Sequence, residues 1–408
     1  MTAEATVQRP RPLAYQRAIA DYLRAEEPGI WEWFSSNRFR EKHAEQVRLD
    51  ILKATYRLER GGHDELYAIA DEVRSALGLG IPLTIYQAPA AEGGMNAFLA
   101  WIPGEAHIVL KGPVLSSLRP GELRAILGHE LSHAILYDLD EGAYLVAGQV
   151  LQAMAGDANA DPSHVESARL YDLYTEVFAD RGSLLASGRA ADSIAALLKV
   201  ETGLAEVSAE SYLRQADEIF AQASPRAEQL THPEAFIRAR ALALWESKGE
   251  ESDPDVARML EGRPALGALD LVARRRVEDL TRDLLTAYLG PETFRTESAV
   301  GHARRFFADF APSPRRTGDL DGLRGFLEGC DASIRDYFCY VVLDLVAVER
   351  ELEDVPLARG LVLSAELGLE GRFSELVGKE LKLSKKALAA ARAGAAGLVA
   401  RAVGEARP

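Results

Sequence analysis

The sequence contains little cysteine, and its cysteines do not have the spacing of metal ligands. Cys330 and Cys339 are the only two among 408 residues, and neither is spaced from a histidine as in a zinc site. This argues against a disulfide framework and against a cysteine-based zinc site, and it favours reduced thiols in a core. We therefore expect a cytoplasmic protein.

Long apolar runs and long basic blocks are also missing. No stretch reaches about 18 uninterrupted apolar residues, and residues 1–12 lack the apolar centre of a signal peptide. The formal charge of −15, from 62 acidic and 47 basic residues, argues against nucleic acid or an anionic membrane as the main partner. We expect a soluble chain with no transmembrane segment.

Apolar residues are nevertheless abundant enough for sizeable cores. They make up 48% of the 408 residues, a length at which about two or three domains are usual. The patterning predicts a mostly α-helical α+β protein. Its parts are a helical N-terminal extension over residues 1–60, a domain with a small sheet over 61–250, and an all-helical accessory bundle over 251–408.

One short segment has the HExxH pattern of a zinc site. Apolar residues recur at helical spacing over residues 122–137, so His129 and His133, four residues apart, share one face of a helix. Two imidazoles in this arrangement can bind one Zn²⁺, and Glu130 lies beside the ion, where a carboxylate can take a proton from water. A pattern of three fixed residues also occurs by chance, so this segment alone does not establish a zinc site. A third ligand must come from elsewhere in the chain.

A small sheet is predicted just before this helix. Two strands, at residues 81–86 and 107–110, enclose a turn that leads into apolar residues. In a zinc protease, an open edge of such a sheet can bind a substrate backbone as an added strand. An ordinary hairpin that supports the helix explains the same pattern equally well.

A carboxylate pair on a later helix can complete the site. Glu176 and Asp180 lie four residues apart and therefore on one helical face. Taken alone, they are typical of a solvated acidic face. With two histidines upstream, Glu176 becomes the candidate third ligand. Asp180 then becomes the candidate acceptor for the second ring N–H of a ligating histidine, His129.

Two later residues are candidates for supporting roles. His232 precedes a proline and is predicted to lie on a loop at the start of a helix, where a histidine is more often a cap or a surface residue. If the zinc site exists, His232 can donate a hydrogen bond to the oxyanion that forms when water attacks a carbonyl. Arg238 can then fix nearby carboxylates.

These separated segments together resemble the gluzincin zinc metallopeptidases of the HtpX and CAAX-prenyl-protease family (metallopeptidase family 48). The likeness extends over about residues 63–245 and keeps the order of the family's motifs. The matching segments are Asn96–Phe98, His129–His133, Glu176–Asp180, and Thr231–Pro233 followed by Arg238.

The resemblance implies a role for each matched position. It implies one zinc ion bound by His129, His133 and Glu176, with Glu130 as the general base. It further implies that Asp180 orients a ligand, that His232 stabilises the transition state, and that Asn96–Phe98 binds the substrate backbone. Membrane-embedded members carry transmembrane helices around the site; this chain is predicted to have none, which argues against prenylated or bilayer-embedded substrates.

The C-terminal region has a weaker likeness. Residues 336–390 are diffusely similar to helical tellurite-resistance TerB-like domains, which implies only an all-helical accessory bundle.

The sequence thus predicts a zinc-dependent endopeptidase that acts on a peptide or protein substrate. Two alternatives stay open. One is a latent or non-catalytic zinc-binding scaffold whose helical C-terminal domain recruits a protein partner. The other is a structural zinc site held by four protein groups. The intact Glu130 argues against both, because neither needs a carboxylate inside this motif.

Overall fold

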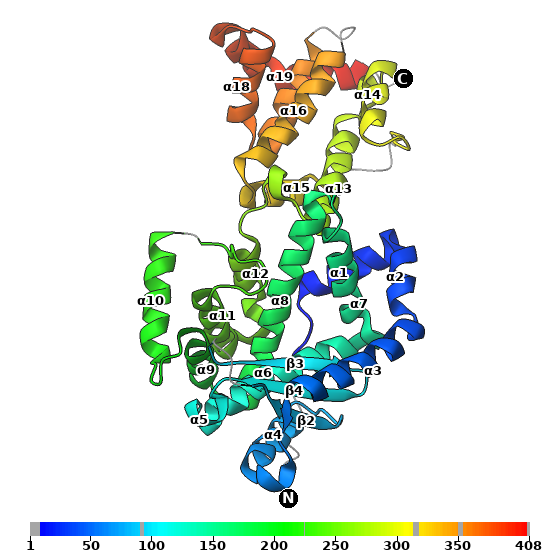
Figure 1. Cartoon of the computed structure of the whole chain (residues 1–408). Helices are drawn as coiled ribbons and strands as arrows, with labels where there is room; N and C mark the ends of the chain where they lie inside the picture. The colour runs from blue at the N-terminus through cyan, green and yellow to red at the C-terminus, as the bar shows by residue number, and fades with distance from the viewer. Residues whose placement is uncertain (1–8, 90–93, 224, 313–317, 350–353, 406–408) are drawn as a thin grey trace, which may run out of the picture. The chain divides into compact units, whose positions relative to one another are not determined.

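The chain folds into two compact units, Met1–Gly262 and Arg263–Pro408 (Figure 1). The computed structural model describes residues 9–89, 94–223, 225–312, 318–349 and 354–405, without the side chains of 37–43. Both units are mainly helical and the first also holds a small sheet, so the predicted mostly α-helical α+β class is confirmed.

The first unit holds helices α1 to α12 and strands β1 to β4. The helices are α1 (Ala14–Glu26), α2 (Pro28–Ser35), α3 (Asn37–Ala54), α4 (Asp64–Ala76), α5 (Val114–Ser117), α6 (Pro120–Asp138), α7 (Ala143–Ala155), α8 (Pro162–Ser187), α9 (Ala190–Thr202), α10 (Ala209–Gln222), α11 (Ala235–Lys248) and α12 (Asp253–Glu261). The strands are β1 (Tyr56–Arg57), β2 (Leu83–Gln87), β3 (Asn96–Ile102) and β4 (Glu105–Lys111).

The sheet has the strand order β1-β2-β4-β3, which leaves β3 at one edge. β2 and β4 are parallel, whereas β3 runs antiparallel to β4, with Ala97 opposite Leu110. β3 lies where the sequence predicts only the exit from a turn, and it forms because its residues pair with β4 along their whole length. The helical N-terminal extension expected over residues 1–60 is not helical to its end: α3 stops at Ala54, and Tyr56 and Arg57 pair with β2.

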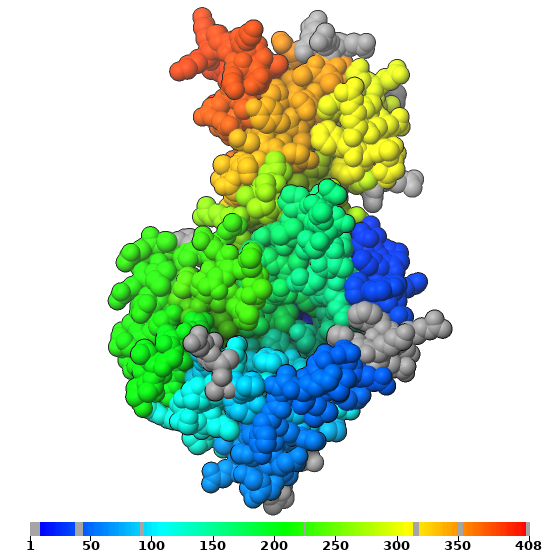
Figure 2. Space-filling model, in the orientation of Figure 1, coloured from blue at the N-terminus to red at the C-terminus, as the bar shows by residue number. Residues whose placement is uncertain are grey.

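Helices cover both faces of this sheet. On one face Ile51 of α3 packs with Tyr86 and Val109, and Figure 2 shows the blue α3 lying in front of the cyan strands. The other face contacts α6. Strand side chains alternate between the two faces, so Ile108, buried beside Val109, points the opposite way, towards α6.

The approach of α6 to α8 depends on two glycines. A Cβ on Gly128 would lie 2.4 Å from the Cβ of Ala186, and a Cβ on Gly182 would lie 1.6 Å from Ser132 Oγ. Neither position can carry a side chain without pushing the helices apart. The glycines therefore allow the HExxH segment of α6 to lie directly against the carboxylates of α8.

The division between the units comes after α12. Arg181 of α8 forms an ion pair with Asp253 at 2.5 Å, and the N–H of Ala227 donates to the carbonyl of Met259 at 2.8 Å. These contacts tie α12 to the first unit, although the sequence suggests a boundary between residues 250 and 251.

The described part of the second unit is entirely helical. Its helices are α13 (Leu271–Tyr288), α14 (Glu297–Phe306), α15 (Leu320–Gly329), α16 (Ala332–Val348), α17 (Val355–Glu366), α18 (Glu370–Glu380) and α19 (Lys385–Glu405). Cys330 and Cys339 are free thiols buried in its core, as expected. Within α19, Lys385–Gly404 is long and apolar enough to cross a membrane by length and composition alone, which is weak evidence for a span.

Candidate metal centre

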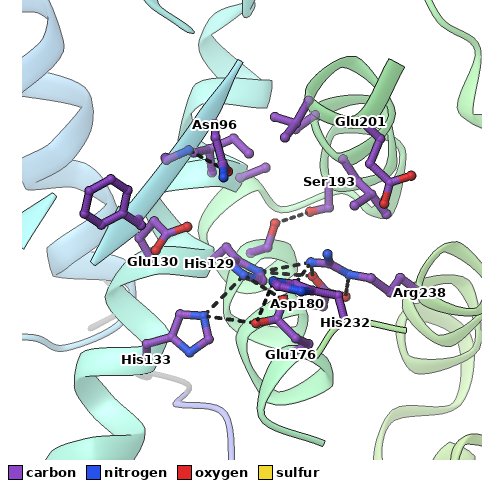
Figure 3. Close-up of a pocket in the computed structure, with 18 of the residues that line it drawn as sticks. Asn96, His129, Glu130, His133, Glu176, Asp180, Ser193, Glu201, His232 and Arg238 are labelled. Atoms are coloured by element: carbon purple, nitrogen blue, oxygen red, sulfur yellow. Dashed lines mark hydrogen bonds and ion pairs between the residues drawn. The ribbon is translucent and has the colours of Figure 1, made fainter. Parts of the chain in front are cut away.

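Three side chains from two helices converge at one point in the first unit (Figure 3). His129 Nε2 lies 3.3 Å from His133 Nε2 and 3.4 Å from Glu176 Oε2. His133 Nε2 lies 3.7 Å from Glu176 Oε1. One potential ligand atom from each of the three residues lies within 4.8 Å of the other two. This spacing can hold one metal ion.

The two helices bring these groups together for simple geometric reasons. His129 and His133 are one turn apart on α6 and point the same way. Glu176 lies on α8, which passes α6 at the glycine contact. All three side chains are nearly buried, with 12% of each imidazole and 10% of the carboxylate exposed to solvent.

The donor set fits zinc. Two imidazole nitrogens and one carboxylate oxygen are ligands that Zn²⁺ prefers, and three protein ligands are typical of a zinc site that keeps an open position. Glu176 Oε2 is buried, and its two cationic neighbours, His129 Nε2 and Arg238 Nη2, lie 3.4 Å and 3.5 Å away without a well-aligned hydrogen bond. A bound cation would give this oxygen a closer partner than either of them.

Asp180 and Arg238 hold the ligand residue His129 in place through hydrogen bonds. Asp180 Oδ1 lies 3.1 Å from His129 Nδ1, so His129 can direct Nε2 towards the metal position. Arg238 of α11 donates two hydrogen bonds to Asp180, from Nε at 2.8 Å and from Nη2 at 2.6 Å. A buried bidentate pair of this kind holds the carboxylate in one orientation.

The pKa values of the three converging residues reflect these contacts. Burial lowers the pKa of His129, but hydrogen bonds to Asp180 and Glu176 outweigh it and raise that pKa to about 10. Burial would raise the pKa of Glu176, but the hydrogen bond and charge of His129 hold it well below its usual range. Burial lowers the pKa of His133 to about 4.

Glu130 lies in the same cleft, beside the histidines rather than among the ligand group. Burial raises the pKa of its carboxyl to about 7, against the lowering effect of the His129 charge. A hydrogen bond from the backbone of Leu99 on β3 also stabilises the charged form. A carboxyl with a pKa near neutrality is suited to accept and return a proton.

His232 reaches the centre from the loop before α11. Its Nε2 lies 3.7 Å from Glu176 Oε1, and 58% of its side chain is exposed. Its Nδ1 lies 2.9 Å from Thr231 Oγ1. Pro233 precedes the helix, whose N-cap is Glu234. The imidazole therefore stands at the solvent side of the cleft, where a substrate would arrive.

The edge strand forms one wall of the cleft, which has a volume of about 960 Å³. Asn96, Ala97 and Phe98 all line it, and Phe98 is 46% exposed. The Oδ1 of Asn96 accepts a hydrogen bond from the N–H of Ala97 at 2.9 Å. An edge strand beside a metal centre offers backbone groups that a peptide can pair with.

The cleft also contains residues that the sequence analysis does not single out. Tyr137 stacks on His133, with ring centroids 6.1 Å apart, and Trp101 of β3 meets Tyr137 edge-on at 6.0 Å. Tyr137 lies four residues after His133, so helical spacing alone would have identified it. Ser193 and Glu201 of α9 also line the cleft, and no pattern in the sequence connects α9 with the metal residues.

Comparison with known proteins supports the zinc interpretation. No curated protein and no solved structure matches the chain. Residues 64–246, which contain the whole candidate centre, match the family model described as peptidase family M48, and this segment is therefore similar to zinc-dependent peptidases.

Proposed function

We propose that the first unit is a zinc endopeptidase that cleaves peptide bonds in a peptide or protein substrate. The observation that carries the proposal is the convergence of His129, His133 and Glu176 with Glu130 beside them in an open cleft. The match to peptidase family M48 independently supports a protease.

Three protein ligands would leave one coordination position of zinc open for water or substrate. Zinc bound by three protein side chains supplies Lewis-acid activation of water and of a substrate carbonyl. Asp180 keeps the proton on Nδ1 of His129, so that Nε2 stays available as a ligand. Arg238 keeps Asp180 in place for that task.

Glu130 and His232 act on the substrate. Glu130 accepts a proton from the attacking water and passes it to the nitrogen of the leaving amine, a transfer that burial of the carboxyl favours by raising its pKa. His232, exposed at the cleft, donates a hydrogen bond to the carbonyl oxygen, which becomes an oxyanion when water attacks the carbonyl carbon.

The substrate backbone binds along β3. A peptide lying antiparallel to this edge would replace the side chain of Asn96 as the acceptor for the Ala97 N–H. The carbonyl to be attacked then lies near Glu130, because Leu99 of the same strand already contacts that carboxylate.

The experiment compares zinc content with proteolysis of unfolded casein for two variants. Glu130→Gln removes the base but no ligand, so it is expected to keep zinc and lose turnover by at least about 100-fold. Glu176→Ala removes a ligand and is expected to lose zinc as well. Glu210→Gln, on the exposed face of α10, is the matched control and should behave as the wild type.

Two results would contradict the proposal. An active Glu130→Gln enzyme would eliminate the base assigned here. A wild-type protein that binds zinc but cleaves no casein, with or without chelator, would favour the non-catalytic scaffold.

A further inference from the structure

One wall of the cleft is formed by residues that have no role in the proposed reaction. Ser193, Ala196, Leu197, Val200 and Glu201 all line the cleft, and their spacing places them on one face of α9. Figure 3 shows Ser193 and Glu201 across the cleft from Asn96 of β3. The space between α9 and β3 is therefore a slot that opens onto the metal centre.

Part of the wall of this slot is apolar. Ala125 and Ile126 of α6 lie just before His129 and line the slot together with Leu197 and Val200. The hydroxyls of Ser183 and Ser193, which also line the cleft, are bonded to each other at 2.9 Å. The stem of a side chain that lies against these four apolar residues would meet methyl and methylene groups.

The far end of the slot is narrow and carries a negative charge. A Cβ placed on Gly94, two residues before β3, would lie 3.9 Å from the carbonyl oxygen of Val200, so the segment that leads into β3 lies against the end of α9. Glu201 is the next residue on α9 and is accessible to solvent.

Glu201 has no tightly bound counter-charge. The charges that act on it are those of Arg238, His232 and Asp180. Arg238 is already paired with Asp180 through two hydrogen bonds, and Glu201 makes no ion pair within 4.0 Å in the part of the chain that the structure describes. Lys111 also lines the cleft, but it is not among the charges that act on Glu201.

We propose that this slot, between α9 and β3, binds the side chain of a lysine or arginine next to the scissile bond, and that Glu201 determines this specificity. Lysine and arginine combine a long apolar stem with a cationic end. The stem matches the walls formed by Ile126, Leu197 and Val200. The cationic end reaches the carboxylate of Glu201, where a charge-assisted hydrogen bond favours it over a neutral or acidic side chain.

This inference rests on the proposed endopeptidase function, so its test has one arm that needs turnover and one that does not. In the first arm, zinc-loaded wild type, Glu201→Gln and Glu201→Lys digest denatured casein, and mass spectrometry maps the cleavage sites. Wild type is expected to cleave next to lysine and arginine. Glu201→Gln should lose that preference by about five- to tenfold, and Glu201→Lys should favour aspartate and glutamate.

The matched control is Glu210→Gln, which removes the same charge from an exposed position of α10. It should keep the wild-type cleavage pattern. Unchanged cleavage sites in Glu201→Gln, or a wild type without preference for basic residues, would overturn the inference while leaving the endopeptidase proposal intact.

The second arm measures binding to the zinc-loaded Glu130→Gln protein. The probes are fluorescein-labelled heptapeptides of glycine and alanine whose central residue is lysine, norleucine or glutamate, and the readout is fluorescence anisotropy. The lysine peptide should bind about five- to tenfold more tightly than the norleucine peptide, and adding Glu201→Gln should abolish the difference. Equal binding of the three peptides would refute the subsite even in a protein that cleaves nothing, whereas absent cleavage with selective binding would refute only the endopeptidase.

Discussion

Asp180 contacts both His129 and Arg238 through one carboxylate. A carboxylate behind a ligating histidine fixes the ring and makes its metal-binding nitrogen a better donor. We expect Asp180→Asn to keep the fold but to weaken zinc binding by about 10- to 100-fold. Competition with a chelator measures this affinity. Asp217→Asn, which disturbs only the exposed pair with Arg240, is the control and should bind zinc like the wild type.

The protonation of His129 makes zinc binding depend on pH. The pKa of this imidazole is raised to about 10 in the metal-free protein, so zinc must displace its proton at any lower pH. His133, with a pKa of about 4, and Glu176, with a lowered pKa, have no proton to release near neutrality.

Apparent zinc affinity should therefore rise about tenfold per pH unit between about pH 8 and 9, where Glu130 with its pKa of about 7 is already ionised, and level off above the pKa of His129. Calorimetry at pH 8.5 in two buffers with different ionisation enthalpies counts the protons released. The expected value is about one proton per zinc ion. Identical binding enthalpies in both buffers would show that His129 is already neutral.

At the scale of secondary-structure elements, the contact between α6 and α8 determines whether the ligands meet. A Cβ on Gly182 would lie 1.6 Å from Oγ and 2.6 Å from Cβ of Ser132. Gly182→Ala is expected to destabilise the first unit by about 1–3 kcal/mol and to weaken zinc binding, because α8 must move away from α6. Thermal unfolding and chelator competition measure the two effects.

A compensating change distinguishes this steric explanation from a general effect of alanine. Ser132→Gly removes the two closest atoms and leaves only the carbonyl oxygen of Gly128, at 3.2 Å from the new Cβ. The double variant should therefore regain most of the zinc affinity lost by Gly182→Ala. Gly301 of α14 has nothing within 4 Å of its would-be Cβ. Gly301→Ala should leave zinc binding unchanged and raise stability slightly, by about 0.5–1 kcal/mol.

The edge strand β3 is expected to act through its backbone. Ala97→Pro removes the N–H that now donates to Asn96, and proline is tolerated on an edge strand. We expect this variant to retain zinc and to lose about tenfold or more in kcat/KM for peptide substrates, because one pairing hydrogen bond is lost. Steady-state kinetics and a measurement of zinc content test this prediction. Unchanged kinetics would mean that the substrate does not pair with β3.

At the scale of the whole molecule, every candidate ligand comes from the first unit, Met1–Gly262. Zinc at about 100 times its Kd should stabilise this unit by about 2.7 kcal/mol and leave Arg263–Pro408 unaffected. Differential scanning calorimetry with and without chelator is therefore expected to show two transitions, of which one moves. A single transition that shifts as a whole would show that the two units unfold together.

Much of the helical pattern could be predicted because it depends on local spacing. The helix expected over residues 122–137 is α6, and the carboxylates Glu176 and Asp180 lie on α8 as a single face. The likeness of the C-terminal helices to TerB-like domains stays a prediction. Strand β3 and the short strand β1 were harder to foresee, because they owe their conformation to pairing with β4 and β2 rather than to their own residues.

The sequence by itself determined which chemical groups are available: two imidazoles one helical turn apart, a carboxylate between them in the chain, and a second acidic pair on one helical face. Those features follow from the helix period and need no tertiary information. Only the tertiary structure decided that His129, His133 and Glu176 meet within 4.8 Å, and that α9 places Glu201 across the cleft from β3. Whether residues from different helices come together depends on how closely the helices pack. At Gly128 and Gly182, α6 and α8 can approach closely because neither residue has a side chain.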